Sequence, residues 1–138
     1  KYKDFTSAPF FTPVPGAGNT TSVGDATGNP LVRTPKWTAT AGVRYETAVG
    51  SGKVDFSADY YYNSGFSWTF DNRYREASYS LVNAQLGWSP DGKNFRLSVF
   101  GKNLTNELYS MGTSVTTFAT AAAYAPPRSY GVAASFKF

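Results

Sequence analysis

Apolar and polar side chains alternate strictly over the last eleven residues of the chain, 128–138. Small or polar residues stand between five apolar or aromatic ones, namely Tyr130, Val132, Ala134, Phe136 and Phe138. A period of two predicts a β-strand with one apolar face and one polar face. Soluble proteins protect exposed strand edges, because such edges pair with other chains. The terminal strand therefore favours a transmembrane β-barrel, whose last strand pairs with its first.

Four other segments have the same period of two, at 37–48, 53–62, 78–89 and 94–104. Each is close to the roughly 9–11 residues that a tilted membrane strand needs. Trp37 and Tyr45 stand at the two ends of one apolar face, as expected of the aromatic girdles at the two membrane surfaces. We also expect residues 1–6 to be the end of a partial strand. A single-chain barrel has at least about eight strands, so these six predict the C-terminal part of a longer chain.

The alternation also separates two acidic residues from the apolar face of their strand. Asp55 and Asp59 lie opposite Val54, Phe56 and Ala58. Because a carboxylate in lipid is costly, we expect both to face the lumen of the barrel. Their spacing along one strand is too wide for a pair of catalytic carboxylates. We interpret them as solvated lumen residues.

The connections between the predicted strands alternate in length. Short turns rich in Gly, Pro and Asp lie at 49–53 and 89–93, whereas residues 7–36, 63–77 and 105–127 form long connections. Outer-membrane barrels have short periplasmic turns and long extracellular loops. The sequence therefore predicts three extracellular loops and a periplasmic C-terminus. We find no strand period within 7–36.

The composition excludes several classes of chemistry. The chain has no Cys and no His, so disulfides, thiolate metal sites and the usual acid–base residue are missing. No apolar run reaches the roughly 20 residues of a membrane-spanning helix. The net charge is +4, but Lys and Arg are scattered singly, whereas a nucleic-acid site would cluster them. We expect no enzyme activity, no catalytic or metal site, no cofactor and no nucleic-acid partner.

Several motifs resemble the C-terminal end of the TonB-dependent receptors. The most specific is Asn103-Leu-Thr-Asn-Glu-Leu-Tyr109, which is similar to the family's Asn-Leu-(Thr/Phe)-(Asp/Asn)-x-x-Tyr before the last extracellular loop. Pro127-Arg-Ser-Tyr-Gly131 resembles the family's entry to its final strand, and Pro35-Lys-Trp37 resembles the start of an earlier one. The resemblance covers about residues 34–138.

The resemblance implies an all-β, antiparallel transmembrane barrel of 22 strands with a plug in its lumen. This chain would supply about the last six strands, and the plug and the TonB box would lie upstream. Such receptors import a scarce nutrient, such as a ferric siderophore, haem, cobalamin or a sugar, with energy from the TonB-ExbB-ExbD complex. The other implied partners are the barrel-assembly machinery, outer-membrane lipids and lipopolysaccharide.

The connection 63–77 holds the candidate ligand-binding residues, Phe66, Trp68, Phe70, Arg73 and Tyr74. Aromatic rings offer stacking area, and Arg pairs with anionic groups such as siderophore carboxylates. The alternative is that these residues belong to the outer aromatic girdle and to packing between loops. Both interpretations stay open at this point.

The terminal strand also resembles the signal that the barrel-assembly machinery recognises, with Tyr130, Gly131, Phe136 and Phe138 as the signal residues. Recognition would occur by addition of this strand to an exposed sheet edge. Two rival classes share parts of the pattern. A passive porin-like channel would have the strands and the terminal Phe but not the receptor motifs, and a soluble carbohydrate-binding β-sandwich would bury its apolar faces in a core.

Overall fold

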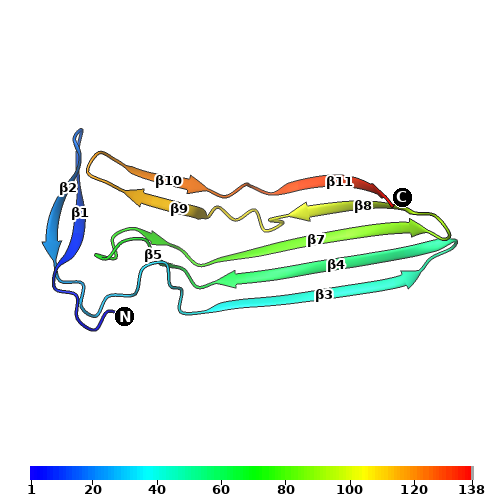
Figure 1. Ribbon diagram of the computed structural model, residues 1–138, viewed down its shortest axis with the longest axis horizontal. Helices are drawn as coiled ribbons and strands as arrows, with labels where there is room; N and C mark the ends of the chain where they lie inside the picture. The colour runs from blue at the N-terminus through cyan, green and yellow to red at the C-terminus, as the bar shows by residue number, and fades with distance from the viewer. Residues whose placement is uncertain (138) are drawn as a thin grey trace. The chain divides into compact units, whose positions relative to one another are not determined.

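The computed structural model describes residues 1–137, which form strands, turns and irregular segments (Figure 1). Phe138 lies outside the described residues. The chain divides into two compact units. We call residues 39–62, 80–107 and 126–138 the sheet unit, and residues 1–38, 63–79 and 108–125 the loop unit. Within residues 1–137, no helix is both long enough and apolar enough to cross a membrane.

The sheet unit is built on five strands in the order β11-β8-β7-β4-β3. Their bounds are β3 Thr38–Ala48, β4 Gly52–Asn63, β7 Tyr79–Pro90, β8 Phe95–Lys102 and β11 Ser129–Phe136. The arrows of neighbouring strands in Figure 1 run in opposite directions, which confirms the predicted antiparallel all-β fold. These strands lie at the five segments where the period of two predicted them, with bounds shifted by one or two residues.

The pairing register gives the sheet two different faces. Leu86 on β7 pairs with Val99 on β8, which in turn pairs with Val132 on β11. Side chains of paired residues share a face, so these three form one apolar row. The next row, on the opposite face, is Gly87, Ser98 and Ala133.

The apolar face has no hydrophobic core beneath it. Leu86, Val99 and Val132 are 48, 49 and 70% exposed, and the buried hydrophobic residues within 1–137 are three alanines. An exposed apolar surface of this kind marks a region that a membrane or a partner protein covers. A β-sandwich would bury such a face against a second sheet.

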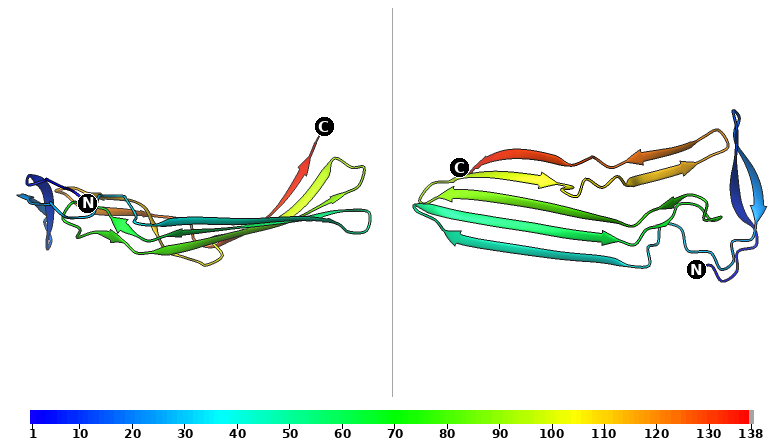
Figure 2. Two further views of the ribbon diagram at one scale, coloured as in Figure 1. Left: turned by 90° about the horizontal axis from the view of Figure 1, so that it is seen from below. Right: turned by 180° about the vertical axis from the view of Figure 1, so that it is seen from behind.

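The sheet is curved, and it does not close on itself within the described residues. Figure 2 shows β8 and β11 bending away from β3 and β4. Twist and curvature of neighbouring antiparallel strands are what the wall of a barrel requires. The sheet unit is therefore similar to a section of a barrel wall.

The loop unit consists of three two-stranded sheets. β1 (Ala8–Val14) pairs with β2 (Gly18–Gly24), β5 (Phe66–Ser67) with β6 (Arg75–Glu76), and β9 (Ser110–Val115) with β10 (Thr120–Tyr124). The long connections are thus largely hairpins. The buried alanines Ala8, Ala26 and Ala125 belong to this unit.

Two expectations about the first 36 residues are wrong. Residues 1–6 contain no strand; the rings of Tyr2 and Phe5 pack against each other there, with centroids 5.1 Å apart. Residues 7–36 contain the hairpin β1–β2, although we found no strand period there. Most of β2 is exposed and polar, so its two faces do not differ in the way that the pattern requires.

Candidate functional site

The hairpin β5–β6 places the candidate ligand-binding residues. Trp68 N–H donates to the Tyr74 carbonyl at 2.7 Å, which closes the segment between the two short strands. Ser67 is 1% exposed, and its hydroxyl donates to the Thr69 carbonyl at 2.7 Å. Asn72 has a left-handed φ of 59° at the tip. The segment is therefore a folded turn held by its own hydrogen bonds.

The five predicted residues do not share one surface. The rings of Phe66 and Trp68 are in edge contact, with centroids 4.8 Å apart. Phe70 packs at 5.2 Å against Phe5, inside the loop unit. Arg73 lies 3.4 Å from the carboxylate of Asp71 in its own turn.

Tyr74 makes a contact between two of the long connections. Its hydroxyl accepts a hydrogen bond from the hydroxyl of Thr120 at 3.3 Å. The structure thus brings Phe66 and Trp68 together, and it engages Phe70, Arg73 and Tyr74 in contacts within the loop unit. Their role in ligand binding stays a prediction.

Sequence reasoning missed Arg33, which lies beside Trp68. The centre of its guanidinium is 5.3 Å from the centroid of the indole ring. Its backbone N–H donates to the Ser67 carbonyl at 2.8 Å, and its φ is 53°. The segment around it is a proline-rich loop, and the only signal in the sequence was a single cation between Pro30 and Pro35.

A hollow of about 370 Å³ adjoins Arg33. Apart from Arg33 it is lined by small residues of the hairpin β9–β10, namely Gly112, Thr113, Ser114, Ala121, Ala122 and Ala123. No ion pair of Arg33 occurs within residues 1–137. The hollow therefore combines a cation that lacks a protein counter-ion with two hydroxyl-bearing side chains.

Hydrogen bonds hold the three long connections together. The Asn19 side-chain amide donates to the Thr116 carbonyl at 2.6 Å, and the Asn29 amide donates to the Phe70 carbonyl at 2.8 Å. Two hydrogen bonds from Thr27 lower the pKa of Asp25, and the one from the Thr27 side chain has a larger effect than the one from its backbone N–H. A surface assembled in this way needs little further ordering when a ligand binds.

The polar face of the sheet unit carries an ion pair that spans three strands. Arg96 on β8 donates to Asp55 on β4 from Nε at 3.0 Å and from Nη2 at 2.6 Å. β7 lies between these two strands, and it presents Gly87 there. A Cβ at Gly87 would lie 2.5 Å from Asp55 Oδ1 and would also collide with Arg96 Nη2. The absence of a side chain at this position lets the ion pair cross the middle strand.

Asp59 has a partner of its own. The Asn83 amide donates to Asp59 Oδ2 at 2.7 Å, so the two carboxylates interact with different neighbours. Asp59, Asn83 and Lys102 line a hollow of about 610 Å³. The arrangement places charges on the face opposite the apolar rows. That the face lines a lumen stays a prediction.

The motif that begins at Asn103 is a turn after β8 that bonds to the segment just before the last strand. Asn103 has a φ of 49°, and its amide donates to the Glu107 carbonyl at 3.0 Å and the Pro126 carbonyl at 3.3 Å. Asn106 Oδ1 accepts from the backbone N–H of Arg128 at 3.2 Å. The motif is therefore structural, because its two asparagines fix the chain just before β11.

Two residues of the predicted assembly signal pair with β8 in a reciprocal manner. Tyr130 pairs with Gly101, and Gly131 pairs with Phe100. A Cβ at Gly131 would collide with the ring of Phe100. In each pair, an aromatic ring lies over a glycine of the neighbouring strand.

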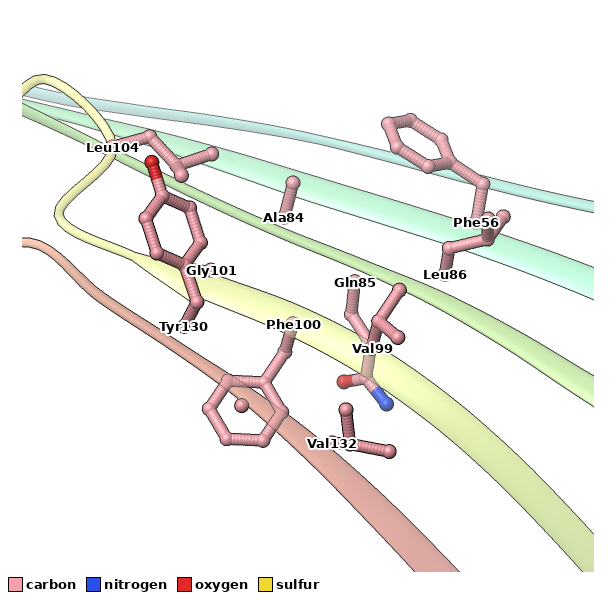
Figure 3. A pocket seen from close by; sticks show the side chains of 11 residues that line it. Phe56, Ala84, Gln85, Leu86, Val99, Phe100, Gly101, Leu104, Tyr130 and Val132 are labelled. Atoms are coloured by element: carbon pink, nitrogen blue, oxygen red, sulfur yellow. The ribbon is translucent and has the colours of Figure 1, made fainter.

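The other two signal residues are at the end of β11. Phe136 packs against Phe95 with ring centroids 5.0 Å apart, whereas Phe138 lies outside the described residues. An apolar hollow of about 500 Å³ is lined by Ala84, Tyr130, Leu104 and Phe56. Figure 3 shows Tyr130 and Leu104 on one side of Ala84 and Phe56 on the other. Recognition by the assembly machinery stays a prediction.

Comparisons with known proteins agree with this fold. The family described as TonB dependent receptor-like, beta-barrel matches residues 4–104. None of the curated proteins compared matches the chain. The ferric yersiniabactin uptake receptor FyuA from Yersinia pestis has a TM-score of 0.75 and 19% identity over 88% of this chain. BauA, the ferric preacinetobactin receptor from Acinetobacter baumannii, has a TM-score of 0.66 and 21% identity over 94% of this chain.

The chain spans 20% of the first structure and 21% of the second, about a fifth of each. At these identities the two structures support the fold. The family match covers most of the chain, including residues 4–33, which the motif resemblance did not cover. The antiparallel sheet with one apolar and one polar face agrees with it. The chain belongs to the TonB-dependent receptors, a family of outer-membrane β-barrel transporters.

Proposed function

We propose that the protein containing this chain is a TonB-dependent outer-membrane transporter that imports a ferric siderophore. The observation that carries the proposal is the sheet unit, in which an exposed apolar face lies opposite a face with the Asp55–Arg96 ion pair. This distribution suits a wall between lipid and an aqueous lumen. The two similar structures are both receptors for ferric compounds, which supports a siderophore over haem, cobalamin or a sugar.

The same proposal sets the orientation of the chain. Short turns connect β3 to β4 and β7 to β8, whereas the long connections follow β4 and β8 at the opposite end of these strands. We place the long connections outside the cell and the C-terminus in the periplasm. The TonB-ExbB-ExbD complex would act through segments upstream of this chain. The apolar face would contact outer-membrane lipids and lipopolysaccharide.

The test is uptake by the full-length receptor in a bacterial strain that lacks its own siderophore receptors. The strain is grown under iron limitation with single ⁵⁵Fe-loaded siderophores, and cell-associated iron is counted. We expect uptake of at least one siderophore, and we expect deletion of the TonB box to abolish uptake while surface binding remains. Uptake that persists without the TonB box would support the passive channel and would overturn the proposal.

A further inference from the structure

Arg33 is fixed in the loop unit by its backbone. Its N–H donates to the carbonyl of Ser67, and the preceding residue, Val32, forms a parallel bridge with Ser67. Ser67 is itself buried and hydrogen-bonded. A non-glycine residue with a φ of 53° is uncommon and needs such surroundings to persist. The start of the Arg33 side chain is therefore held at one position before any ligand arrives.

The guanidinium is oriented by Trp68. It lies over the indole ring at 5.3 Å, and the indole N–H donates to Glu76 Oε2 at 3.2 Å, which fixes the ring in turn. Glu76 thus has a partner, and no carboxylate forms an ion pair with Arg33 within residues 1–137. An arginine stacked on an aromatic ring keeps its N–H groups available in its own plane, where they match the two oxygens of a carboxylate.

The hollow beside Arg33 gives a ligand room. Its volume of about 370 Å³ is within the range of small-molecule sites. The hairpin β9–β10 keeps it open because Thr113 pairs with Ala122 and Ser114 pairs with Ala121, so no long side chain fills the space. Thr113 and Ser114 also line the hollow; because they are neighbours on β9, their side chains leave opposite faces of the hairpin.

We propose that Arg33 binds a carboxylate of the transported ligand, which is therefore an anionic iron chelate. The body of the chelate occupies the hollow against β9–β10. Arg73 does not compete for this role, since it is paired with Asp71. This inference rests on the proposed transport function and narrows its substrate class.

The experiment measures binding of ⁵⁵Fe chelates to the purified full-length receptor. Ferric citrate and ferric rhizoferrin are the anionic, carboxylate-bearing probes, ferrichrome is the neutral probe and ferrioxamine B the cationic one. The variants are Arg33→Gln and Arg33→Lys. Arg75→Gln is the matched control, because Arg75 is an exposed arginine of the same unit and does not line the hollow. Folding is checked by the heat-dependent gel shift of the barrel.

We expect the receptor to bind a carboxylate-bearing probe and Arg33→Gln to weaken this binding about 10- to 100-fold. Arg33→Lys should restore part of it, and Arg75→Gln should change it less than about threefold. Binding restricted to the neutral or cationic probe, or an unchanged affinity in Arg33→Gln, would overturn the inference and leave the transport proposal standing. Failure to bind any iron chelate would overturn both.

Discussion

Substituting Gly87 with alanine should separate the ion pair on the polar face of the sheet. The new methyl group would lie 2.5 Å from Asp55 Oδ1 and would overlap Arg96 Nη2. Either the two side chains move apart or β7 shifts. Since these side chains are 28 and 33% exposed, we discount their two charge-assisted hydrogen bonds to about 1–2 kcal/mol. Crowding adds about 1 kcal/mol, so the expected loss is about 2–3 kcal/mol.

Gly42→Ala is the matched control. A Cβ at Gly42 on β3 would meet only the Ala58 carbonyl oxygen, at 3.7 Å, which is an ordinary contact. Both substitutions replace a strand glycine, so the difference between them removes the general gain of about 0.5–1 kcal/mol from lower chain entropy. The measurement is denaturant unfolding of the full-length receptor in lipid vesicles, compared as free energies of unfolding.

A double-mutant cycle tests the cause. In an Asp55→Asn, Arg96→Gln background the ion pair is already absent, so Gly87→Ala should cost less than about 1 kcal/mol. If Gly87→Ala destabilises the receptor no more than Gly42→Ala, or costs the same in both backgrounds, the reasoning about the crossing ion pair is wrong.

Three further substitutions test other parts of the structure. Asn103→Ala removes the side-chain hydrogen bonds of Asn103 and places alanine at a left-handed φ. It should therefore lower the free energy of unfolding by about 2–4 kcal/mol in the same assay. The control is Asn94→Ala, at an exposed position between β7 and β8. Deleting Phe138 should lower the amount of folded receptor in the outer membrane without changing ligand affinity per folded molecule; normal amounts of folded receptor would contradict the assembly role. Asn19→Ala removes two hydrogen bonds to the third long connection and should speed amide hydrogen exchange in residues 110–124. Unchanged exchange there would show that Asn19 does not couple the two hairpins.

The sequence predicted the strands of the sheet unit well, because each strand has one apolar and one polar face, which leaves a period of two in its residues. The hairpin β1–β2 was missed since most of β2 is exposed and polar, so nothing selects alternate residues there. The sequence predicted correctly that Asp55 lies on the face opposite the apolar row. It did not indicate Arg96 as the partner of Asp55, because Arg96 lies two strands away in the sheet. Gly87, which makes this contact possible, has no side chain that could have signalled it.

The candidate site was less predictable than the fold. The aromatic residues of 63–77 stood out by type, yet only the structure shows that Phe70 packs inward while Trp68 lies under Arg33. That contact joins two segments far apart in the chain, and no local pattern encodes it. The Asn103 motif was recognisable by resemblance, but its hydrogen bonds to Pro126 and Glu107 became apparent only in three dimensions.

The two asparagines before β11 have a consequence for the diversification of receptors of this kind. Asn103 and Asn106 bind the chain at Pro126 and Arg128, so the segment between them leaves and returns at a fixed pair of points. We therefore expect insertions, deletions and exchanges within 108–125 to leave the register of β11 on β8 unchanged. Under the proposed transport function, this would make the segment a suitable unit for grafting between receptors to redirect their selectivity.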